Sequence, residues 1–337
     1  MRVSLMKYAA ASTIAMLWLT SCNSFTAGPG LIAGQTNHAG TIRHRTSQCP
    51  CLYVPNADGN SITVYGSGAA GNASPIQQIY GSNTGLDSPQ DVAVDGSANI
   101  YVANYENNTV TIYGAGATGN VAPARTISGS STGLAGPVGI ALDSVNGDIY
   151  VANYNDNSVT IYASDANGNV APLGAISGSS TGLDEPFGLA LDGSGNIYVP
   201  NNRNSSLTIY AAGSTGNVAP TRTIAGRRTK LENTYKLALD SSLNLYVADD
   251  LKLGPLIEYA AGAKGNVAPK ETIKGRLTQL YYPIGIALDS SNNIYAANYV
   301  KSSITVYAAG STGNVAPINT IDGPSTGLNH PVGITIR

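Results

Sequence analysis

One polar side chain recurs along this chain of 337 residues at a spacing of 48 or 49, each time ending a motif similar to Tyr-Val-Ala-Asn. Six amide or carboxylate groups at equivalent positions could hold a cation or a sugar hydroxyl, because both take oxygen ligands. Alternatively, each side chain bonds its own backbone and opens a tight turn. The six are Asn56, Asn104, Asn153, Asn201, Asp249 and Asn298, with Asn153, Asn201 and Asp249 as candidate metal ligands.

A second recurring segment, GSSTGL followed by two variable residues and then Pro, departs from its consensus in two copies, which read GRRTKLENT and GRLTQLYYP. Arg offers forked donors and Tyr a stacking face, so these copies predict a surface for an anionic or glycan ligand. Alternatively, the charges only solvate the surface. The candidate ligand-binding residues are Arg227, Arg228, Lys230, Tyr235, Lys236, Arg276, Tyr281 and Tyr282.

The charges are unevenly distributed although the net charge is only −2. Residues 203–301 carry twelve Lys or Arg against seven acids, whereas residues 22–202 carry three against twelve. The small net charge argues against nucleic acid as a partner. The distribution predicts a strongly dipolar molecule.

Asp91 and Lys236 replace the same Gly of the repeat in its second and fifth copies. In a ring of six copies these two positions lie opposite each other, so both side chains should face the central channel. Whether they meet depends on the width of that channel. An unpaired charge there would be destabilising if the channel is dry.

The elements that must position these residues are short strands in repeated units. In the second copy, residues 92–94, 100–103, 109–113 and 125–127 are β-rich runs separated by turn residues. Four-stranded antiparallel units of 48 or 49 residues are typical of a β-propeller, and six copies predict six blades.

The two ends of the repeat region supply an independent indication of ring closure. The first copy begins at its second run, near Leu52, and the missing first run appears at residues 331–336. One C-terminal strand should therefore join three N-terminal strands. An open β-solenoid, the alternative, gives no reason to divide a repeat in this way.

The unit Pro-x-Gly-Ile-Ala-Leu-Asp followed by Asn-Ile-Tyr-Val resembles the NHL repeat of six-bladed propellers, as at residues 137–143 and 196–199. The Tyr-Val-Ala-Asn core with residues 157–162 is also similar to the YVTN repeats of bacterial surface proteins. This resemblance covers residues 51–337. It implies a fold whose members bind proteins, RNA or sugars, or hydrolyse small esters.

The N-terminus reads as an export signal. Arg2 and Lys7 precede an apolar run over residues 8–19, and residues 19–22 resemble a bacterial lipobox, with Cys22 as the lipidated residue. We expect a signal peptide over residues 1–21, a flexible tether over 22–48 and the propeller over 49–337. The protein should be a monomer, lipid-anchored in the bacterial cell envelope, either periplasmic or surface-exposed.

Lipidation would leave Cys49 and Cys51 as the remaining cysteines. Export places them in an oxidising compartment, where a disulfide can persist, but the bridge would be strained at this spacing. The sequence therefore allows either a strained disulfide or two thiols.

Two functions are compatible with these observations. The first is a non-enzymatic binding scaffold without a cofactor, for an anionic or glycan ligand or a protein partner. The second is a calcium-dependent hydrolase resembling gluconolactonases, with Asp91, Glu185 and Asp249 as catalytic candidates. His330 is the only His beyond residue 44, which argues against zinc lyases and serine hydrolases.

Overall fold

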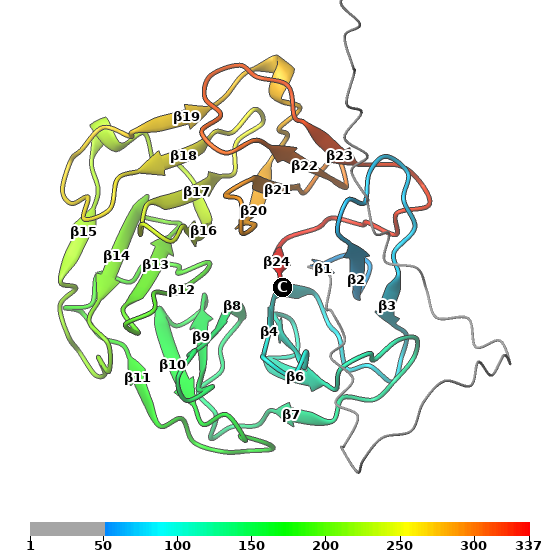
Figure 1. Ribbon diagram of the computed structural model, residues 1–337. Coiled ribbons are helices and arrows are strands. Elements are labelled where there is room, and N and C mark those ends of the chain that lie inside the picture. The colour runs from blue at the N-terminus through cyan, green and yellow to red at the C-terminus, as the bar shows by residue number, and fades with distance from the viewer. Residues whose placement is uncertain (1–50) are drawn as a thin grey trace, which may run out of the picture. The chain divides into compact units, whose positions relative to one another are not determined.

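The computed structural model describes residues 51–337, which form six four-stranded antiparallel sheets around a central axis (Figure 1). This confirms the predicted six-bladed β-propeller. The predicted signal peptide, the lipidation site Cys22, the tether over 22–48 and Cys49 lie outside the described residues. No helix in the described part of the chain is long and apolar enough to cross a membrane.

Each sheet is one blade, and we number the blades in chain order. Blade 1 contains β24 (Thr335–Ile336), β1 (Cys51–Asn56), β2 (Ser61–Gly66) and β3 (Gln77–Tyr80). Blade 2 contains β4 (Pro89–Val94), β5 (Ile100–Asn104), β6 (Thr109–Tyr113) and β7 (Arg125–Ile127). Blade 3 contains β8 (Pro137–Leu142), β9 (Ile149–Asn153), β10 (Ser158–Tyr162) and β11 (Gly174–Ile176).

The remaining blades repeat this order from the axis outward. Blade 4 contains β12 (Ala190–Leu191), β13 (Ile197–Asn201), β14 (Ser206–Tyr210) and β15 (Arg222–Ile224). Blade 5 contains β16 (Thr234–Leu239), β17 (Leu245–Asp249), β18 (Leu256–Tyr259) and β19 (Glu271–Ile273). Blade 6 contains β20 (Pro283–Leu288), β21 (Ile294–Asn298), β22 (Ser303–Tyr307) and β23 (Asn319–Ile321).

Ring closure is made by the two ends of the repeat region, as predicted. In blade 1, β24 pairs with β1, with Ile336 opposite Leu52. The backbone N–H of Arg337 donates to the Cys51 carbonyl at 2.9 Å, and that of Val332 to the Pro55 carbonyl at 3.1 Å. The contact extends beyond the two residues of β24, so the whole segment 331–337 acts as the innermost strand of blade 1.

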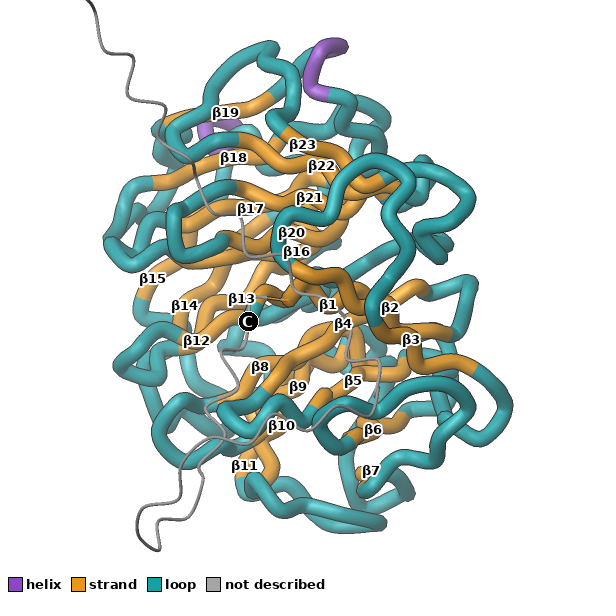
Figure 2. The backbone as a smooth tube through the Cα atoms, turned by 45° about the vertical axis from the view of Figure 1, so that its right-hand side comes forward, coloured by secondary structure: helices purple, strands orange, loops and turns teal. Residues whose placement is uncertain are grey.

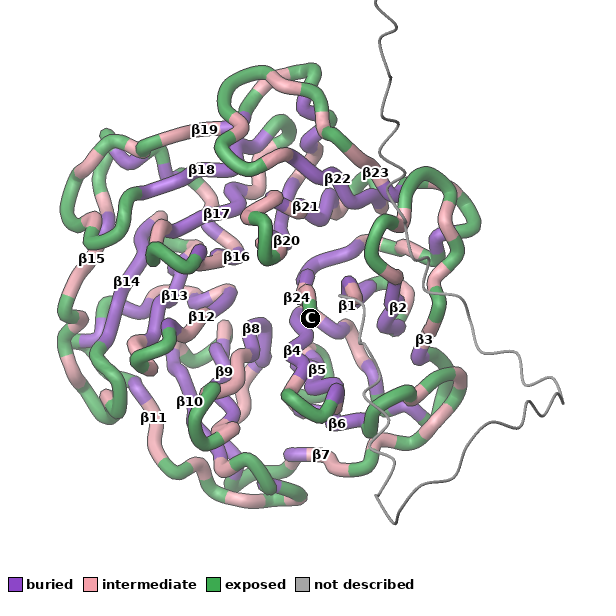
Figure 3. Tube along the Cα trace, viewed as in Figure 1, coloured by how far each residue is buried: buried purple, intermediate pink, exposed green. Residues whose placement is uncertain are grey.

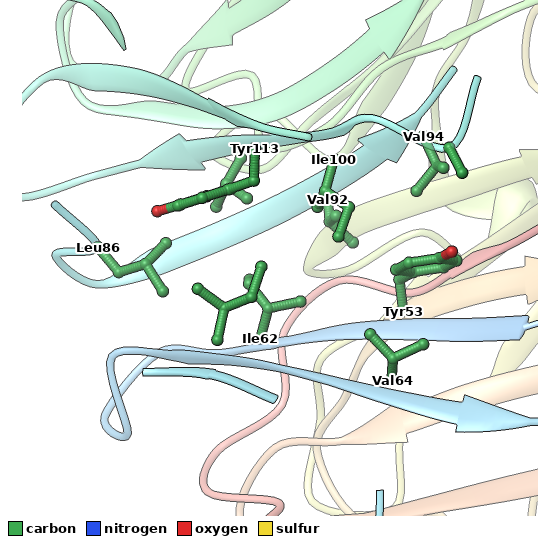
Figure 4. Packing of buried hydrophobic residues seen from close by; sticks show 11 residues of the cluster. Tyr53, Ile62, Val64, Leu86, Val92, Val94, Ile100 and Tyr113 are labelled. Carbon is green, nitrogen blue, oxygen red and sulfur yellow. The ribbon is translucent and has the colours of Figure 1, made fainter. Parts of the chain in front are cut away.

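The core lies between adjacent blades. Apolar residues of neighbouring sheets interdigitate there, and the strands are mostly buried while the loops are exposed (Figure 3). Between blades 1 and 2, for example, Ile62 and Val64 face Val92 and Ile100, and all four are at most 1% exposed (Figure 4). Burial of such side chains contributes about 1.5–3 kcal/mol each, so every blade depends on both neighbours.

A Tyr at the end of each third strand fixes the loop that leads into the innermost strand. Its buried hydroxyl donates to a Thr carbonyl in that loop, as from Tyr113 to Thr84 at 2.6 Å and from Tyr162 to Thr132 at 2.6 Å. The same bond occurs in all six blades, through Tyr65, Tyr113, Tyr162, Tyr210, Tyr259 and Tyr307. These loops end at the axis, so the bonds also position the residues around the channel.

The innermost strands approach the axis closely. A Cβ atom at Gly139 would lie 2.7 Å from the Cα atom of Gly188 in the next blade, closer than real Cβ contacts occur. This explains the Gly in the repeat, and it makes the two exceptions, Asp91 and Lys236, informative.

Candidate functional site

The six recurring amides and carboxylates are buried at the ends of the second strands. The Asn153 amide donates to the Ser158 and Thr160 hydroxyls at 3.1 and 3.0 Å, and its oxygen accepts the Ala135 N–H at 3.2 Å. The Asn201 oxygen likewise accepts the Asp184 N–H at 3.1 Å. These bonds join a turn between strands to the loop that leads to the axis. A cation bound at these oxygens would have to displace them.

Asp249 differs from the other five because its hydroxyl partners are missing. In blade 5 the strand register places Pro255 and Ile257 where the other blades have Ser or Thr hydroxyls. The second side-chain oxygen instead takes a second backbone donor, so the carboxylate accepts the N–H groups of Glu232 at 2.9 Å and Asn233 at 2.8 Å. This substitution is therefore explained by local hydrogen bonding.

Asp249 should make stability depend on pH. Burial raises its pKa to about 6, against about 3.9 in an unfolded chain. A carboxyl whose pKa rises on folding stabilises the folded state at low pH, and that contribution is lost as the pH rises from about 4 to about 6. Denaturant unfolding measures this effect as the free energy of unfolding of Asp249→Asn minus that of the wild type. This difference should rise by about 2 kcal/mol from about pH 4.5 to about pH 7.5, because only the wild type loses stability over that range. A difference that is constant over this range would contradict the raised pKa.

Asp91 and Lys236 meet across the axis, with Lys236 Nζ 3.0 Å from Asp91 Oδ2. Both residues are buried, at 8% and 5% exposure. The carboxylate also accepts the N–H groups of Val92 and Ile140, each at 3.1 Å, and the ammonium donates to the Val138 carbonyl. Burial raises the pKa of Asp91 and lowers that of Lys236, opposed by the attraction between the two groups. The pair thus links blades 2, 3 and 5.

The neighbouring glycines leave room for this pair. A Cβ atom at Gly333 would lie 2.5 Å from Asp91 Oδ1, and one at Gly188 would lie 3.0 Å from Lys236 Cδ. The ion pair therefore occupies space at the axis that the small residues of other blades provide.

A cavity of about 420 Å³ lies on one side of the ion pair, inside the ring of innermost strands. Asp91 and Lys236 are among its lining residues, together with apolar side chains such as Leu142 and Leu239. Val138, Ile284 and Val332, which precede the level of the pair along their strands, do not line it and are at most 5% exposed. The pair and these side chains therefore form the closed end of the cavity.

On the other side of the pair lies a row of four aromatic side chains, which we call the aromatic arc: Tyr105, Tyr154, Phe187 and Tyr235. The successive ring centroids are 6.3, 5.8 and 4.2 Å apart, and all four residues are partly exposed. Tyr105 and Tyr154 directly follow β5 and β9, and the other two residues lie where the chain enters the innermost strands of blades 4 and 5. Lys236 Nζ is 5.6 Å from the centroid of the Phe187 ring, so this ring of the arc lies over the ammonium of the ion pair.

Carboxylates accompany the arc. The Tyr154 hydroxyl donates to Glu185 Oε2 at 2.8 Å, and burial together with Glu185 raises the pKa of Tyr154 to about 12. Two residues before Tyr235, the Asn233 amide donates to the backbone carbonyl of Asp250 at 2.9 Å, and burial raises the pKa of Asp250 to about 6. Aromatic faces and hydrogen-bond acceptors thus alternate along this end of the channel.

Beyond the arc, the rings of Tyr299 and His330 pack against each other at an interplanar angle of 50°, with their centroids 4.6 Å apart. His330 Nδ1 is 3.0 Å from Asp58 Oδ2, and burial followed by the charge of Asp58 raises the pKa of Tyr299. Tyr299 lies next to blade 5 through Tyr282, whose carbonyl accepts the Tyr299 N–H and whose own N–H donates to the Leu251 carbonyl. The aromatic and acidic side chains therefore continue from blade 5 through blade 6 to blade 1.

Glu185 and His330 lie at a turn whose backbone is left-handed in most blades. Both have φ of 53°, and the equivalent residues Ser88, Gly136 and Tyr282 have φ of 50°, 62° and 52°. The conformation therefore belongs to the repeated turn before the innermost strand, and the residue type at this position varies from blade to blade.

The residues of the predicted basic surface do not lie together in the structure. Arg227, Arg228 and Arg276 are exposed and belong to the short helices η1 (Arg227–Thr229) and η2 (Arg276–Thr278), which lie at the outer edge of the ring, drawn in purple in Figure 2. Lys230 follows η1 and is also exposed. Tyr281 and Tyr282 pack edge to face, 5.2 Å apart.

Of the residues predicted to bind a ligand, only Tyr235 and Lys236 lie by the arc, and the ammonium of Lys236 is buried in its ion pair. It is therefore not available at the rim. Of the catalytic candidates, Glu185 accompanies the arc, Asp91 is paired with Lys236, and Asp249 is bound by backbone N–H groups. The described residues contain no group of three or more His, Cys, Asp or Glu side chains arranged to hold a metal ion.

Sequence reasoning missed most of the aromatic arc. The available signal was the position after each recurring Asn or Asp, which is more variable than the position before it. That position holds Ala57, Tyr105, Tyr154, Asn202, Asp250 and Tyr299. The residue type changes there because it faces the channel end, whereas the preceding Asn is required by the turn.

Fold and channel define this protein as a six-bladed β-propeller. Residues 134–162 match the family model of the NHL repeat. No curated protein matches the sequence significantly.

Solved structures resemble the fold at low identity. A protein of unknown function from Bacteroides caccae has a TM-score of 0.62 and 11% identity, covering 86% of this chain and 98% of its own. A proposed 6-phosphogluconolactonase from Bacteroides uniformis has a TM-score of 0.56 and 17% identity, covering 85% and 87%. A streptogramin B lyase has a TM-score of 0.55 and 14% identity, covering 83% and 82%. At these identities the likeness concerns the fold alone.

Proposed function

We propose that this protein is a non-enzymatic binding propeller, exported and lipid-anchored at Cys22, that binds a glycan at the aromatic arc. The observation that carries the proposal is the row of four partly exposed rings in mutual contact. Aromatic faces stack on the apolar face of a sugar ring, and nearby carboxylates accept hydrogen bonds from its hydroxyls. A row of rings suits several consecutive sugar units.

The arrangement favours a glycan over a small anion at this end of the channel. Glu185 and Asp250 accompany the arc, whereas the ammonium of Lys236 is buried and paired with Asp91. The exposed basic residues of η1 and η2 lie at the outer edge. An anionic ligand would therefore meet carboxylates at the arc.

The calcium-dependent hydrolase is the second candidate, and its donor set fits the ion less well. The side-chain oxygens of Asn153, Asn201 and Asp249 accept backbone N–H groups, which an ion would displace. Asp250, whose pKa is raised to about 6, is the carboxyl by the arc that suits a general base near neutral pH. Addition of calcium should raise the melting temperature if this function holds.

Binding to an array of oligosaccharides, followed by calorimetry, tests the proposed function. Tyr154→Ala and Tyr235→Ala should each weaken binding about tenfold or more, because each removes a stacking face. Tyr80→Ala is the matched control, since Tyr80 is 53% exposed on an outer strand. Thermal unfolding would confirm that the variants are folded. Unchanged affinity in both arc variants, or no oligosaccharide bound by the wild type, would overturn the proposal.

A further inference from the structure

Blades 5 and 6 lie side by side in the ring, and their rim carries exposed apolar side chains (Figure 1). Leu253, in the loop after β17, is 40% exposed, and Val300, in the equivalent loop after β21, is 48% exposed. Leu277, in η2, is 60% exposed. Single exposed side chains of this kind are common, but several on one surface mark an interaction site.

Contacts around Tyr281 and Tyr282 join the segments that carry these side chains. The Tyr282 N–H donates to the carbonyl of Leu251, in the loop after β17, at 3.2 Å. Lys301 Nζ, from the loop after β21, lies 5.5 Å from the centroid of the Tyr281 ring and donates to the carbonyl of Gln279, which follows η2, at 3.4 Å. This rim, which we call the edge surface, comprises residues 250–254, 274–282 and 299–302.

The edge surface is positively charged. Its only acid is Asp250, which is partly buried. Its exposed cations are Lys252, Lys274, Arg276 and Lys301. By contrast, residues 51–202, which contain β1 to β13, carry one Arg against twelve acids. A negatively charged partner would therefore attract the edge surface and repel the blades across the ring.

We propose that the edge surface binds an anionic lipid bilayer, so that the propeller rests on the membrane by this rim. The inference rests on the lipid anchor at Cys22 in the proposed function, because the anchor brings the bilayer close. The cations attract anionic headgroups, while Leu277, Val300 and the Tyr281 ring contact the interfacial layer beneath the headgroups.

The mixture of side chains favours a bilayer over an acidic protein. A bilayer offers negative charge and an apolar layer at one surface, which suits cationic, aliphatic and Tyr side chains that lie together. Contact through one rim also agrees with the proposed glycan site. Tyr105 and Tyr154 belong to blades 2 and 3, across the ring, so they stay open to a ligand.

Lysine labelling on vesicles tests the inference with the full lipid-anchored chain. The vesicles contain phosphatidylcholine alone, or phosphatidylcholine with about 30% phosphatidylglycerol. An amine-reactive reagent is added, and mass spectrometry follows each lysine. Lys252 and Lys301 should react about fivefold more slowly on the anionic vesicles, because the bilayer covers them. Lys270, which precedes β19 at the end of the strand away from η2, is the internal control and should react equally on both.

Leu277→Asp should remove the protection of Lys252 and Lys301, because it places a negative charge against the headgroups. Leu173→Asp is the matched control, since Leu173 is 67% exposed just before β11 in blade 3, and it should keep the protection. Protection that survives Leu277→Asp would overturn the inference. Equal labelling on both kinds of vesicle would also overturn it, and would leave an acidic protein as the partner of this surface.

The outcomes separate this inference from the proposed function. A chain that leaves the phosphatidylcholine vesicles would overturn the lipid anchor, but protection of Lys252 and Lys301 on the anionic vesicles would still support the edge surface. Oligosaccharide binding is measured without vesicles, so its failure would overturn the glycan site alone.

Discussion

Lys236→Met should lower the free energy of unfolding by about 3–5 kcal/mol, because it leaves the Asp91 carboxylate buried without its counter-ion. The pair lies at the axis, only 3.0 Å apart, with both residues at most 8% exposed. It also joins blades on opposite sides of the ring, so one substitution weakens several contacts. Denaturant unfolding followed by tyrosine fluorescence or circular dichroism measures the loss.

A double-mutant cycle identifies the ion pair as the cause. Asp91→Ala together with Lys236→Met removes both charges. The double variant should lose less free energy of unfolding than the two single variants lose in sum, and the difference should be about 2 kcal/mol or more. Arg203→Met is the control, since the Arg203–Glu185 pair is wider, at 3.7 Å, and exposed. Its effect should be about 0–1 kcal/mol. Small and additive effects of the two axial substitutions would show that the pair is not buried as described.

Removal of residues 331–337 should prevent stable folding at 37 °C. The segment supplies the innermost strand of blade 1, and it buries Val332 and Ile334 at 1% and 6% exposure. Loss of each such side chain costs about 2–4 kcal/mol, and each lost strand hydrogen bond about 1 kcal/mol. The sum approaches the whole stability of a typical domain, about 5–15 kcal/mol.

The truncation has a direct rescue. A synthetic peptide of residues 331–337, added in excess, should restore a cooperative unfolding transition, because it can pair with the free edge of β1. A scrambled peptide of the same composition is the control. A truncated chain with an unchanged melting temperature would mean that closure of the ring contributes little.

The blades were predictable from the sequence because they rest on local pattern. The Tyr-Val-Ala-Asn motif, its spacing and the turn residues after it predict strands such as β5, β9 and β13, and the structure has them at those positions. Closure by the C-terminal strand was predictable for a similar reason, since a divided repeat can be completed only by its missing run.

The candidate site was predictable only in part. Asp91 and Lys236 stood out as exceptions to Gly, but their contact depended on the bore of the channel, which no single repeat determines. Arg227 and Arg276 stood out more strongly, yet they lie on outer loops. A residue that departs from the repeat consensus therefore showed that one blade differs from the others, but it did not show how far that residue lies from the axis.

By itself, the sequence determined that six similar units of four short strands follow one another, because hydrophobic alternation and turn chemistry act within a few residues. Only the tertiary structure decided which side chains meet across the axis. Phe187 and Tyr235 belong to neighbouring blades, and Asp91 and Lys236 to opposite ones. Such contacts depend on how closely the six sheets converge, and that is set by the packing of all the blades together.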